Sequence, residues 1–376
     1  MGLIEWIREE INSAPTQAIP FARYMELALY HPVWGYYMTD RQKVGRQGDF
    51  YTSAAVHPVF AETLADVVAA MCRAGEFAKP HLVEIGGGPG SLCRFLLDRL
   101  RESAPELYQR IRVVMIETSP YHRAMQQESL RDHEVEKVWY DSLGEAARET
   151  NGITGVVLSN EWLDAFPVHI VEKQAGGWRE VWVASNDEGF VETYRDPTPA
   201  LAGYLKSMEE EVEVPRGVRI EVNLAMDQAA RDVAQLLDAG YVITIDYGDL
   251  QEELYHPSRK KGTLMCYHRH QAHDDPYQHV GEQDLTCHVN FSQWMKSGEE
   301  NGLRVLDYLR QDQFLMRCGL LQKAVAHADR DPFTSQAMKR NRAIVQLLDP
   351  AGLGGRFRVV VQGKNVRQDT RFYPIN

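Results

Sequence analysis

The 376-residue chain has few cysteines and no long apolar run, and each of these absences excludes a class of protein. The five cysteines form no CxxC pair, so neither a disulfide framework nor a thiolate zinc site is expected, and a reducing compartment is indicated. No apolar run approaches the roughly 20 residues that cross a bilayer. The N-terminus, MGLIEWIREEINSAP, has neither the basic and apolar regions of a signal peptide nor the acid-poor composition of a transit peptide. These absences predict a cytoplasmic protein without a membrane span.

The chain also lacks an excess of basic residues. It has 41 Lys and Arg against 53 Asp and Glu, a formal net charge of −12. A field of that sign repels phosphate backbones, so nucleic acid is not an expected partner. Hydrophobic residues make up 44% of the chain, which is ordinary for globular proteins and sufficient for one large core with an insertion, or for two domains.

Apolar periodicity predicts a three-part organisation. Residues 1–80 read as a helical N-terminal cap, in which the aromatic loop over 29–53 is either packed by its own rings or a lid over a site. From residue 81, short apolar runs alternate with helical segments, which predicts an α/β fold with a parallel sheet covered on both faces. The predicted strands are 81–85, 111–117, 135–141, 153–161 and 241–248, with two more at 302–309 and 356–363.

The stretch between the fourth and fifth of these strands is unusually long. About 75 residues lie there, where a crossover needs only a dozen or more. It contains alternating strands around Gly-Gly, typical of a β-hairpin, followed by a charged helix. We therefore predict that 166–240 is an inserted substrate or partner subdomain, and that 81–165 and 241–376 form the core.

A glycine-rich loop, VEIGGGPGSL, follows the first predicted strand. Glu84, Gly86, Gly88 and Gly90 precede a predicted helix, at a place where glycines let the backbone approach a ligand closely. A dinucleotide fingerprint would need glycine where the chain has Ser91. The E-x-G-x-G-x-G pattern instead favours S-adenosylmethionine (SAM), whose methionine part contacts such a loop. The alternative is a tight turn without a ligand.

Acidic residues end the next two predicted strands. Glu117 could accept hydrogen bonds from both ribose hydroxyls, and Asp141 from the adenine amino group. Ser119, Ser142 and Asn160, close to the ends of these strands and the fourth, complete the predicted cofactor-binding set. Each acid could instead be a solvent-facing terminal residue, but the loop and both acids occur in the order that a nucleoside ligand needs.

Several motifs resemble the MidA-like methyltransferases, a family that includes the mitochondrial arginine methyltransferase that assists assembly of respiratory complex I. They are IPFARYMELALYHPVWGYY, GDFYTS, VEIGGGPGSL, IETSP with a following Gln, SNEWLDAFPVH, IDYG, GTLMCYHRH and GEQDLTCHVNF. The resemblance implies a seven-stranded class I (Rossmann-like) SAM methyltransferase sheet with a helical N-terminal segment and an inserted β-hairpin and helix subdomain. It also implies SAM as cofactor, S-adenosylhomocysteine as product and a protein arginine as substrate. Phe95 stands where the family usually has Asp.

The stretch SNEWLDAFPVH supplies the predicted acceptor side. A guanidinium stays protonated, and its planar fork is best held by two carboxylates, which Glu161 and Asp164 could supply. SNEWLD also resembles the Ser-Glu-Trp-Met loop of the main protein arginine methyltransferases. That resemblance implies that Glu161 orients the guanidinium, Asp164 is a second acceptor and Trp162 walls the pocket. The alternative for Asp164 is capping of a following helix.

Three further features border the predicted site. Asp246 and Tyr247 end the fifth strand and could line the same pocket, with Tyr247 expected to bind substrate, or they could be ordinary strand ends. His288, in DLTCHVNF, could pair with an acid or take up a proton late, or be a satisfied loop histidine. The third feature is a polar cluster of four histidines and an aspartate: His268, His270, His273, Asp274 and His279. Its spacing matches no common zinc site, so no metal is expected, and a polar loop that closes over the site is favoured.

Together these features predict a SAM-dependent methyltransferase with arginine on a protein as the expected acceptor. The alternatives are a methyltransferase acting on a small amine or carboxylate, and a non-catalytic SAM-binding assembly factor in which SNEWLD is a partner surface. A nicotinamide oxidoreductase is disfavoured by Ser91. The target protein, the degree of methylation and the oligomeric state stay open, with a homodimer as one alternative.

Overall fold

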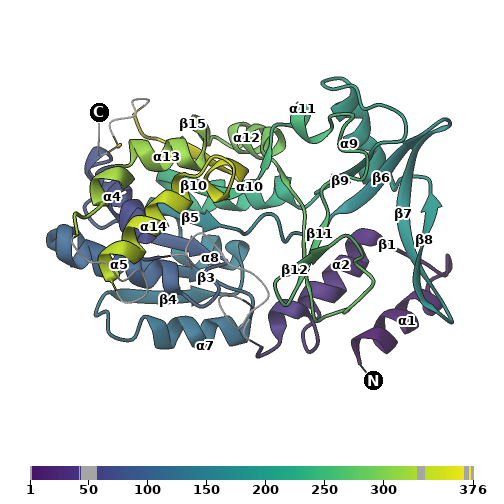
Figure 1. The fold of residues 1–376 in the computed structure, drawn as a ribbon, viewed down its shortest axis with the longest axis horizontal. Helices are drawn as coiled ribbons and strands as arrows, with labels where there is room; N and C mark the ends of the chain where they lie inside the picture. The colour runs from purple at the N-terminus through teal and green to yellow at the C-terminus, as the bar shows by residue number, and fades with distance from the viewer. Residues whose placement is uncertain (1, 42, 44–56, 328–334, 368–371, 374–376) are drawn as a thin grey trace. The chain divides into compact units, whose positions relative to one another are not determined.

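The structure, a computed structural model, describes residues 2–41, 43, 57–327, 335–367, 372 and 373 (Figure 1). The chain divides into two compact units. Unit 1 comprises Met1–Phe50, Leu163–Gln228 and Gly248–Trp294, and unit 2 comprises Tyr51–Trp162, Ala229–Tyr247 and Met295–Asn376. The predicted division into a cap (1–80), a core (81–165 and 241–376) and an inserted subdomain (166–240) stays a prediction. The motif GDFYTS lies outside the described residues.

Unit 2 is built on a mixed β-sheet. Its strands lie in the order β15 (Arg304–Arg310), β16 (Phe357–Lys364), β10 (Leu237–Asp249), β5 (Ile153–Asn160), β2 (His81–Ile85), β3 (Arg112–Ile116) and β4 (Glu136–Tyr140). Its strands are apolar runs such as HLVEI, which are typical of strands buried on both faces. The strands β10, β5, β2, β3 and β4 run parallel, whereas β16 is antiparallel to β10 and β15. The predicted parallel sheet is therefore a mixed one, because the chain enters β16 at the same end of the sheet at which it leaves β15. The two-residue β14 pairs with the end of β10, so the sheet has eight strands where seven are predicted.

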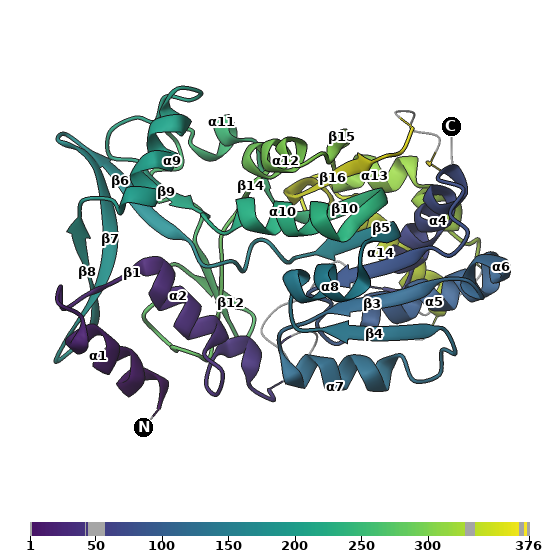
Figure 2. The ribbon, with the colours of Figure 1, turned by 180° about the vertical axis from the view of Figure 1, so that it is seen from behind.

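Helices cover both faces of this sheet. The helices α5 and α14 lie over one face in Figure 1, and α10 lies over the other in Figure 2. Burial follows the helical period, since α5 buries Leu92, Leu96 and Leu100 against the core. The elements of unit 2 are α4 (Val59–Ala74), β2 (His81–Ile85), α5 (Ser91–Ser103), α6 (Pro105–Tyr108), β3 (Arg112–Ile116), α7 (Pro120–Ser129), β4 (Glu136–Tyr140), α8 (Leu143–Thr150), β5 (Ile153–Asn160), β15 (Arg304–Arg310), α13 (Gln311–Arg317), η2 (Leu320–Lys323), α14 (Gln336–Leu348), α15 (Leu353–Arg356) and β16 (Phe357–Lys364).

Unit 1 contains two smaller sheets. One has the order β1-β7-β6-β9 with β8 paired to β7, and the other has the order β12-β11-β13. The strands β6 and β7 form the predicted hairpin, with Gln174 opposite Gly177. The elements are α1 (Leu3–Ser13), β1 (Ile19–Pro20), α2 (Phe21–Tyr30), η1 (Tyr36–Met38), β6 (His169–Gln174), β7 (Gly177–Asn186), β8 (Gly189–Arg195), α9 (Pro199–Glu209), β9 (Arg219–Val222), α11 (Gln251–Leu254), β11 (Met265–His268), β12 (Gln271–His273), β13 (Asp284–Thr286) and β14 (Val289–Asn290).

Three elements contain residues assigned to both units: α10 (Met226–Leu236), β10 (Leu237–Asp249) and α12 (Phe291–Glu300). Among the described residues, no helix combines the length and the apolar character that a membrane crossing requires.

Candidate active site

The predicted cofactor residues follow the carboxyl ends of neighbouring parallel strands in unit 2. The glycine loop follows β2, Glu117 follows β3, Asp141 follows β4, and Asn160 ends β5. These strands are adjacent in the order β5-β2-β3-β4, so their ends meet at one edge of the sheet. That edge is where ligands bind in open α/β sheets.

The glycine loop packs against Trp162 and leaves one position open. Gly86 and Gly88 have φ of 65° and 50°, in the left-handed region that favours glycine. A β-carbon on Gly86 would lie 3.0 Å from Cδ1 of Trp162, so the indole packs directly on the loop. A β-carbon on Gly88 would meet no atom within 4 Å. The loop therefore presents bare backbone at Gly88, and it ends at Gly90, the N-cap residue of α5.

Glu117 is a buried acid that already accepts several hydrogen bonds. Its Oε1 accepts from the backbone N–H of Ser119 at 2.9 Å, and its Oε2 accepts from Nε2 of Gln126 at 3.2 Å. The backbone N–H of Gly88 donates to the same carboxylate. Burial raises the pKa of Glu117 to about 7, although these hydrogen bonds favour its charged form. An ionised Glu117 keeps lone pairs for the hydroxyls of a ribose.

Gln126 joins three parts of this site and is not among the predicted residues. Its Nε2 donates to the carbonyl of Gly88 at 2.9 Å as well as to Glu117. Its Oε1 accepts from Nε1 of Trp139 at 3.0 Å, and the side chain is fully buried. The signal in the sequence is the Gln that follows IETSP in the family-like motif.

Glu84 supports the glycine loop from within the protein. Its buried carboxylate accepts from the backbone N–H of Cys93 in the first turn of α5. A β-carbon on Gly87 would lie 2.9 Å from its Oε2, an atom without a hydrogen-bond partner among the described residues. Burial raises the pKa of Glu84 to about 8, and the nearby charge of Glu117 adds to that rise. These contacts are those of a residue that positions the loop.

Asp141 and the two predicted serines have protein partners of their own. The carboxylate of Asp141 forms an ion pair with Arg123, and its side chain is 67% exposed. Ser119 is the N-cap of α7, and Ser142 is the N-cap of α8. Both hydroxyls therefore serve as helix caps, and their contact with a cofactor stays a prediction.

The turn after β5 fixes the carboxylate of Glu161. Glu161 has a left-handed φ of 54°, which few residues other than glycine adopt. Its N–H donates to the carbonyl of Ile245 at 2.9 Å, and Nδ2 of Asn160 donates to its Oε1 at 2.9 Å. The Oδ1 of Asn160 is buried and has no hydrogen-bond partner among the described residues. Oδ1 of Asn160 is therefore a buried acceptor that the described residues leave unsatisfied.

Asp246, in β10 three residues before that strand ends, contacts the same turn from the neighbouring strand. Its Oδ2 accepts from the backbone N–H of Trp162 at 3.1 Å, and its Oδ1 accepts from that of Tyr247 at 2.8 Å. The ring of Tyr247 packs on Phe357, with the ring centroids 3.9 Å apart. Asp246 is therefore a positioning residue for Trp162, and a substrate contact for Tyr247 stays a prediction.

Asp164 and His288 belong to unit 1. Asp164 is buried, and its carbonyl accepts from the backbone N–H of Cys287 at 2.9 Å. Residues 161–168 form turns and irregular backbone that lead into β6, so the alternative in which Asp164 caps a helix is wrong. Nδ1 of His288 lies 3.2 Å from a guanidinium nitrogen of Arg259, which also forms an ion pair with Asp249.

Comparison with known proteins places the chain in a family. A family model described as "Putative S-adenosyl-L-methionine-dependent methyltransferase" matches residues 59–309. A relative named protein arginine methyltransferase NDUFAF7, mitochondrial, from Danio rerio, is 28% identical and is aligned over 91% of this chain and 83% of its own. The homologue of that name in Drosophila melanogaster is also 28% identical, over 95% of this chain and 84% of its own.

A solved structure agrees with this assignment. A COG1565 superfamily member from Burkholderia thailandensis, bound to S-adenosyl-homocysteine, has a TM-score of 0.87 and 34% identity. The alignment covers 99% of this chain and 94% of that one.

The comparisons also correct one prediction and bear out another. The relatives named above are mitochondrial proteins by name, so the prediction of a cytoplasmic location is wrong. SAM as cofactor is confirmed by the family and by the product bound in the related structure. The chain belongs to this methyltransferase family, and it is a SAM-dependent enzyme of the MidA-like group that its motifs predict.

Proposed function

We propose that this methyltransferase acts on an arginine side chain of a protein, with Glu161 and Asp164 holding the guanidinium. The observation that carries the proposal is the turn after β5, in which Asn160 fixes the carboxylate of Glu161 through a 2.9 Å hydrogen bond. The names of the two relatives support the class of acceptor, since both are protein arginine methyltransferases.

Residues on the carboxyl edge of the unit 2 sheet fit SAM. Gly88 offers bare backbone, Glu117 offers acceptors for a ribose, and Oδ1 of Asn160 suits the ammonium of a methionine part. We assign the remaining predicted contacts to the same cofactor, with Glu84 acting through the loop. They are Gly86, Gly90, Ser119, Asp141 and Ser142. We assign substrate recognition to the predicted cap, 1–80, and to the subdomain 166–240.

The chemistry requires orientation of the acceptor more than activation of the donor. When bound, SAM would supply a methyl group activated by its positively charged sulfur, with S-adenosylhomocysteine as the leaving group. A guanidinium keeps its charge and delocalises its lone pairs, so an unassisted nitrogen is a poor nucleophile. A carboxylate that accepts from the guanidinium draws positive charge to one side and directs the remaining nitrogen. In this proposal Glu161 does so, Asp164 is the second acceptor, and Trp162 is the pocket wall beside the loop.

The methylated guanidinium retains its charge, so the reaction releases one proton from the attacked nitrogen. We assign uptake of that proton to His288. Its backbone N–H donates to Oγ1 of Thr263 at 3.0 Å, and Nδ1, the one acceptor of its neutral ring, faces the guanidinium of Arg259 at 3.2 Å. Uptake of the proton at Nδ1 would therefore require Arg259 to move away from the ring. A histidine can take up a proton near neutral pH.

The experiment that tests the proposal is incubation of the full chain with methyl-labelled SAM and a cell lysate, followed by mass spectrometry of labelled peptides. We expect label on arginine that is lost with Glu161→Gln and retained with Glu102→Gln, an exposed control in α5. Label confined to small amines or carboxylates would favour the first alternative. SAM binding without transfer of label to any fraction would favour a non-catalytic assembly factor.

A further inference from the structure

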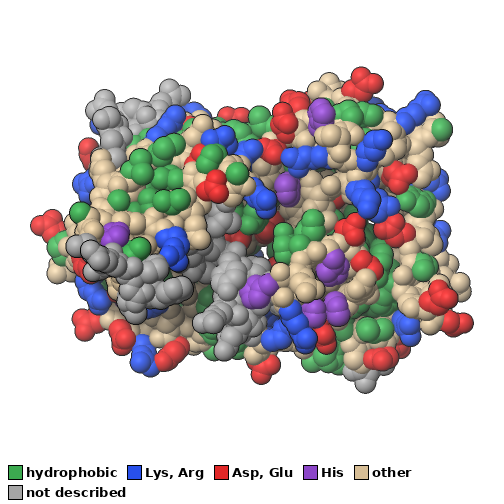
Figure 3. All heavy atoms as spheres, in the orientation of Figure 1, with side chains coloured by type: hydrophobic (Ala, Val, Ile, Leu, Met, Phe, Trp, Pro, Cys, Tyr) green, Lys and Arg blue, Asp and Glu red, His purple; other side chains and the backbone are tan. Residues whose placement is uncertain are grey.

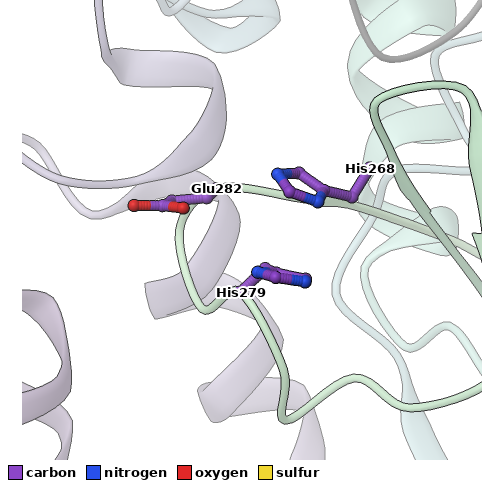
Figure 4. A group of neighbouring side chains, drawn as sticks. All are labelled: His268, His279 and Glu282. Atoms are coloured by element: carbon purple, nitrogen blue, oxygen red, sulfur yellow. The ribbon is translucent and has the colours of Figure 1, made fainter.

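We propose that His268, His279 and Glu282 form a binding site for a zinc-class divalent ion in unit 1 (Figure 4). Each side chain offers one ligand atom, and these atoms all lie within 4.8 Å of one another. Figure 4 shows the imidazoles of His268 and His279 lying one over the other, with the carboxylate of Glu282 to one side, and these residues come from two separate segments of the chain. The proposal is independent of the acceptor that the enzyme methylates.

The fold brings these two segments side by side. His268 ends β11, the central strand of the sheet β12-β11-β13. His279 and Glu282 belong to one turn, which is closed by a 2.7 Å hydrogen bond from the N–H of Glu282 to the carbonyl of His279. The rings of His268 and His279 stack with their centroids 4.0 Å apart and an interplanar angle of 26°. The two imidazoles, one from each segment, are therefore already in contact with each other.

The turn is held in its conformation by other parts of unit 1. Gly281 has φ of 78°, and a β-carbon on it would lie 2.6 Å from Leu3 and 2.8 Å from the carbonyl of Trp34. The guanidinium of Arg41 donates to the carbonyl of Glu282 at 2.6 Å. These contacts place the backbone of two ligands in advance, which lowers the entropy that binding must overcome.

The donor set selects the kind of ion. Two imidazoles and one carboxylate with a fourth position open are a common set for Zn²⁺, whereas Mg²⁺ and Ca²⁺ prefer oxygen ligands throughout. With metal–ligand distances of about 2.0–2.2 Å, the ligand atoms of a tetrahedral site lie about 3.3 Å apart. His279 and Glu282 are exposed, so rotation of their side chains can supply the closure needed.

The surrounding surface provides matched controls. Figure 3 shows histidine side chains gathered on the face over β11 and β12. His270 lies in the same segment but outside the group of three ligands. His273 accepts at Nδ1 from the N–H of Asp275 at 3.3 Å, and its ring centroid is 6.4 Å from that of His279. An ion at the proposed site would tie β11 to the turn that packs on α1.

The test is calorimetric titration of the chelator-treated full chain with ZnCl₂, with Mg²⁺ in a parallel titration. We expect one Zn²⁺ per chain, a rise in melting temperature on Zn²⁺ addition and no Mg²⁺ uptake at the same concentrations. His279→Ala and Glu282→Gln should each weaken Zn²⁺ binding by roughly 10–100-fold or more, and His270→Ala should bind as the wild type does. Because both ligands are exposed, circular dichroism should show native folding in these variants.

Three results would overturn the proposal. One is a wild-type chain that takes up no Zn²⁺ in the titration. Another is wild-type affinity in the double variant of His279→Ala and Glu282→Gln, which would locate the ion elsewhere. The last is an equal loss of affinity in His270→Ala and His279→Ala, which would indicate diffuse binding to the histidine-rich surface.

Discussion

The side-chain amide of Asn160 donates a 2.9 Å hydrogen bond to the carboxylate of Glu161 at the point where β5 ends. The left-handed backbone of Glu161 costs on the order of 1–3 kcal/mol, and such strain persists only where surrounding contacts fix it. Here the contacts are those of Ile245 with Glu161 and of Asp246 with Trp162. The protein therefore fixes the direction of an acid at the strand end, which is what orientation of a substrate requires.

Glu161→Gln should retain the cofactor and lose turnover. The amide has the shape of the acid, so the turn and the glycine loop should be preserved. The amide is uncharged, however, and no longer attracts a guanidinium. We expect a fall in kcat/KM on the order of 10²–10³, as for the loss of one charged group at a reacting centre. Methyl transfer from labelled SAM measures turnover, and calorimetry with S-adenosylhomocysteine measures the cofactor site. Full activity in this variant would remove Glu161 from the acceptor side.

Gly88→Val should abolish cofactor binding with a limited effect on folding. Its β-carbon would enter space free of protein atoms, so the variant should carry only backbone strain and a side chain in the way of the ligand. We expect a loss in S-adenosylhomocysteine affinity of roughly 100-fold or more, about 2.7 kcal/mol. Gly217→Val is the matched control, because Gly217 has φ of 76° and no atom within 4 Å of the added β-carbon. Equal affinity in the two variants would contradict the role of the loop.

Gln126→Leu should weaken both folding and cofactor binding. The change removes hydrogen bonds to Gly88, Glu117 and Trp139 and leaves buried polar groups unpaired, each at about 1–3 kcal/mol. Urea unfolding and calorimetry with S-adenosylhomocysteine measure the two effects. Gln127→Leu is the control, since Gln127 is exposed on the same helix and its change should stay within about 0.5 kcal/mol. Wild-type affinity in Gln126→Leu would show that cofactor binding does not depend on the hydrogen bonds of Gln126 to the glycine loop and Glu117.

The strands of the core are predictable because buried parallel strands are continuous apolar runs. The first predicted strand, 81–85, coincides with β2, and the others differ at their ends by a few residues. The direction of β16 and the presence of β14 are not predictable in this way. The pairing of β16 depends on how the chain folds back after β15, and a two-residue strand has no periodicity to read.

The residues of the two sites also differ in whether local sequence or tertiary packing determines their contacts. Glu117 and Asn160 are predictable because their positions at strand ends are local properties of the sequence. Gln126 is 38 residues from Gly88, and its contacts exist only once α7 packs beside the loop. Glu282 is not predictable from the sequence for the same reason: it lies near His268 only because its turn lies beside β11 in the folded protein. Contacts of that kind are set by tertiary structure, which spacing in one sequence does not reveal.

The raised pKa of Glu117 predicts that the cofactor-free protein loses stability as pH rises. Its pKa is about 7 in the folded protein against an ordinary value of 4.5, so folding favours the neutral acid. This contribution is fully present below about pH 4.5 and is lost as pH rises toward about 7. Glu84, with a pKa raised to about 8, extends the loss to higher pH. Glu117→Gln should lack the share that Glu117 contributes between about pH 4.5 and 7 and keep the share of Glu84, as measured by urea unfolding across the range.

Cofactor affinity should change with pH in the opposite direction. Ribose hydroxyls donate hydrogen bonds, so their contact favours the ionised carboxylate of Glu117 and lowers its pKa in the complex. Below about pH 7 binding then releases a proton, and the affinity for S-adenosylhomocysteine should rise with pH, by at most about tenfold per unit, and level off above that value. Calorimetry in buffers of different ionisation enthalpy detects the released proton directly. Glu117→Gln should bind more weakly and with a flat profile between about pH 6 and 8. A wild-type profile that is flat, or a variant that keeps the rise, would place the ribose contact on another residue.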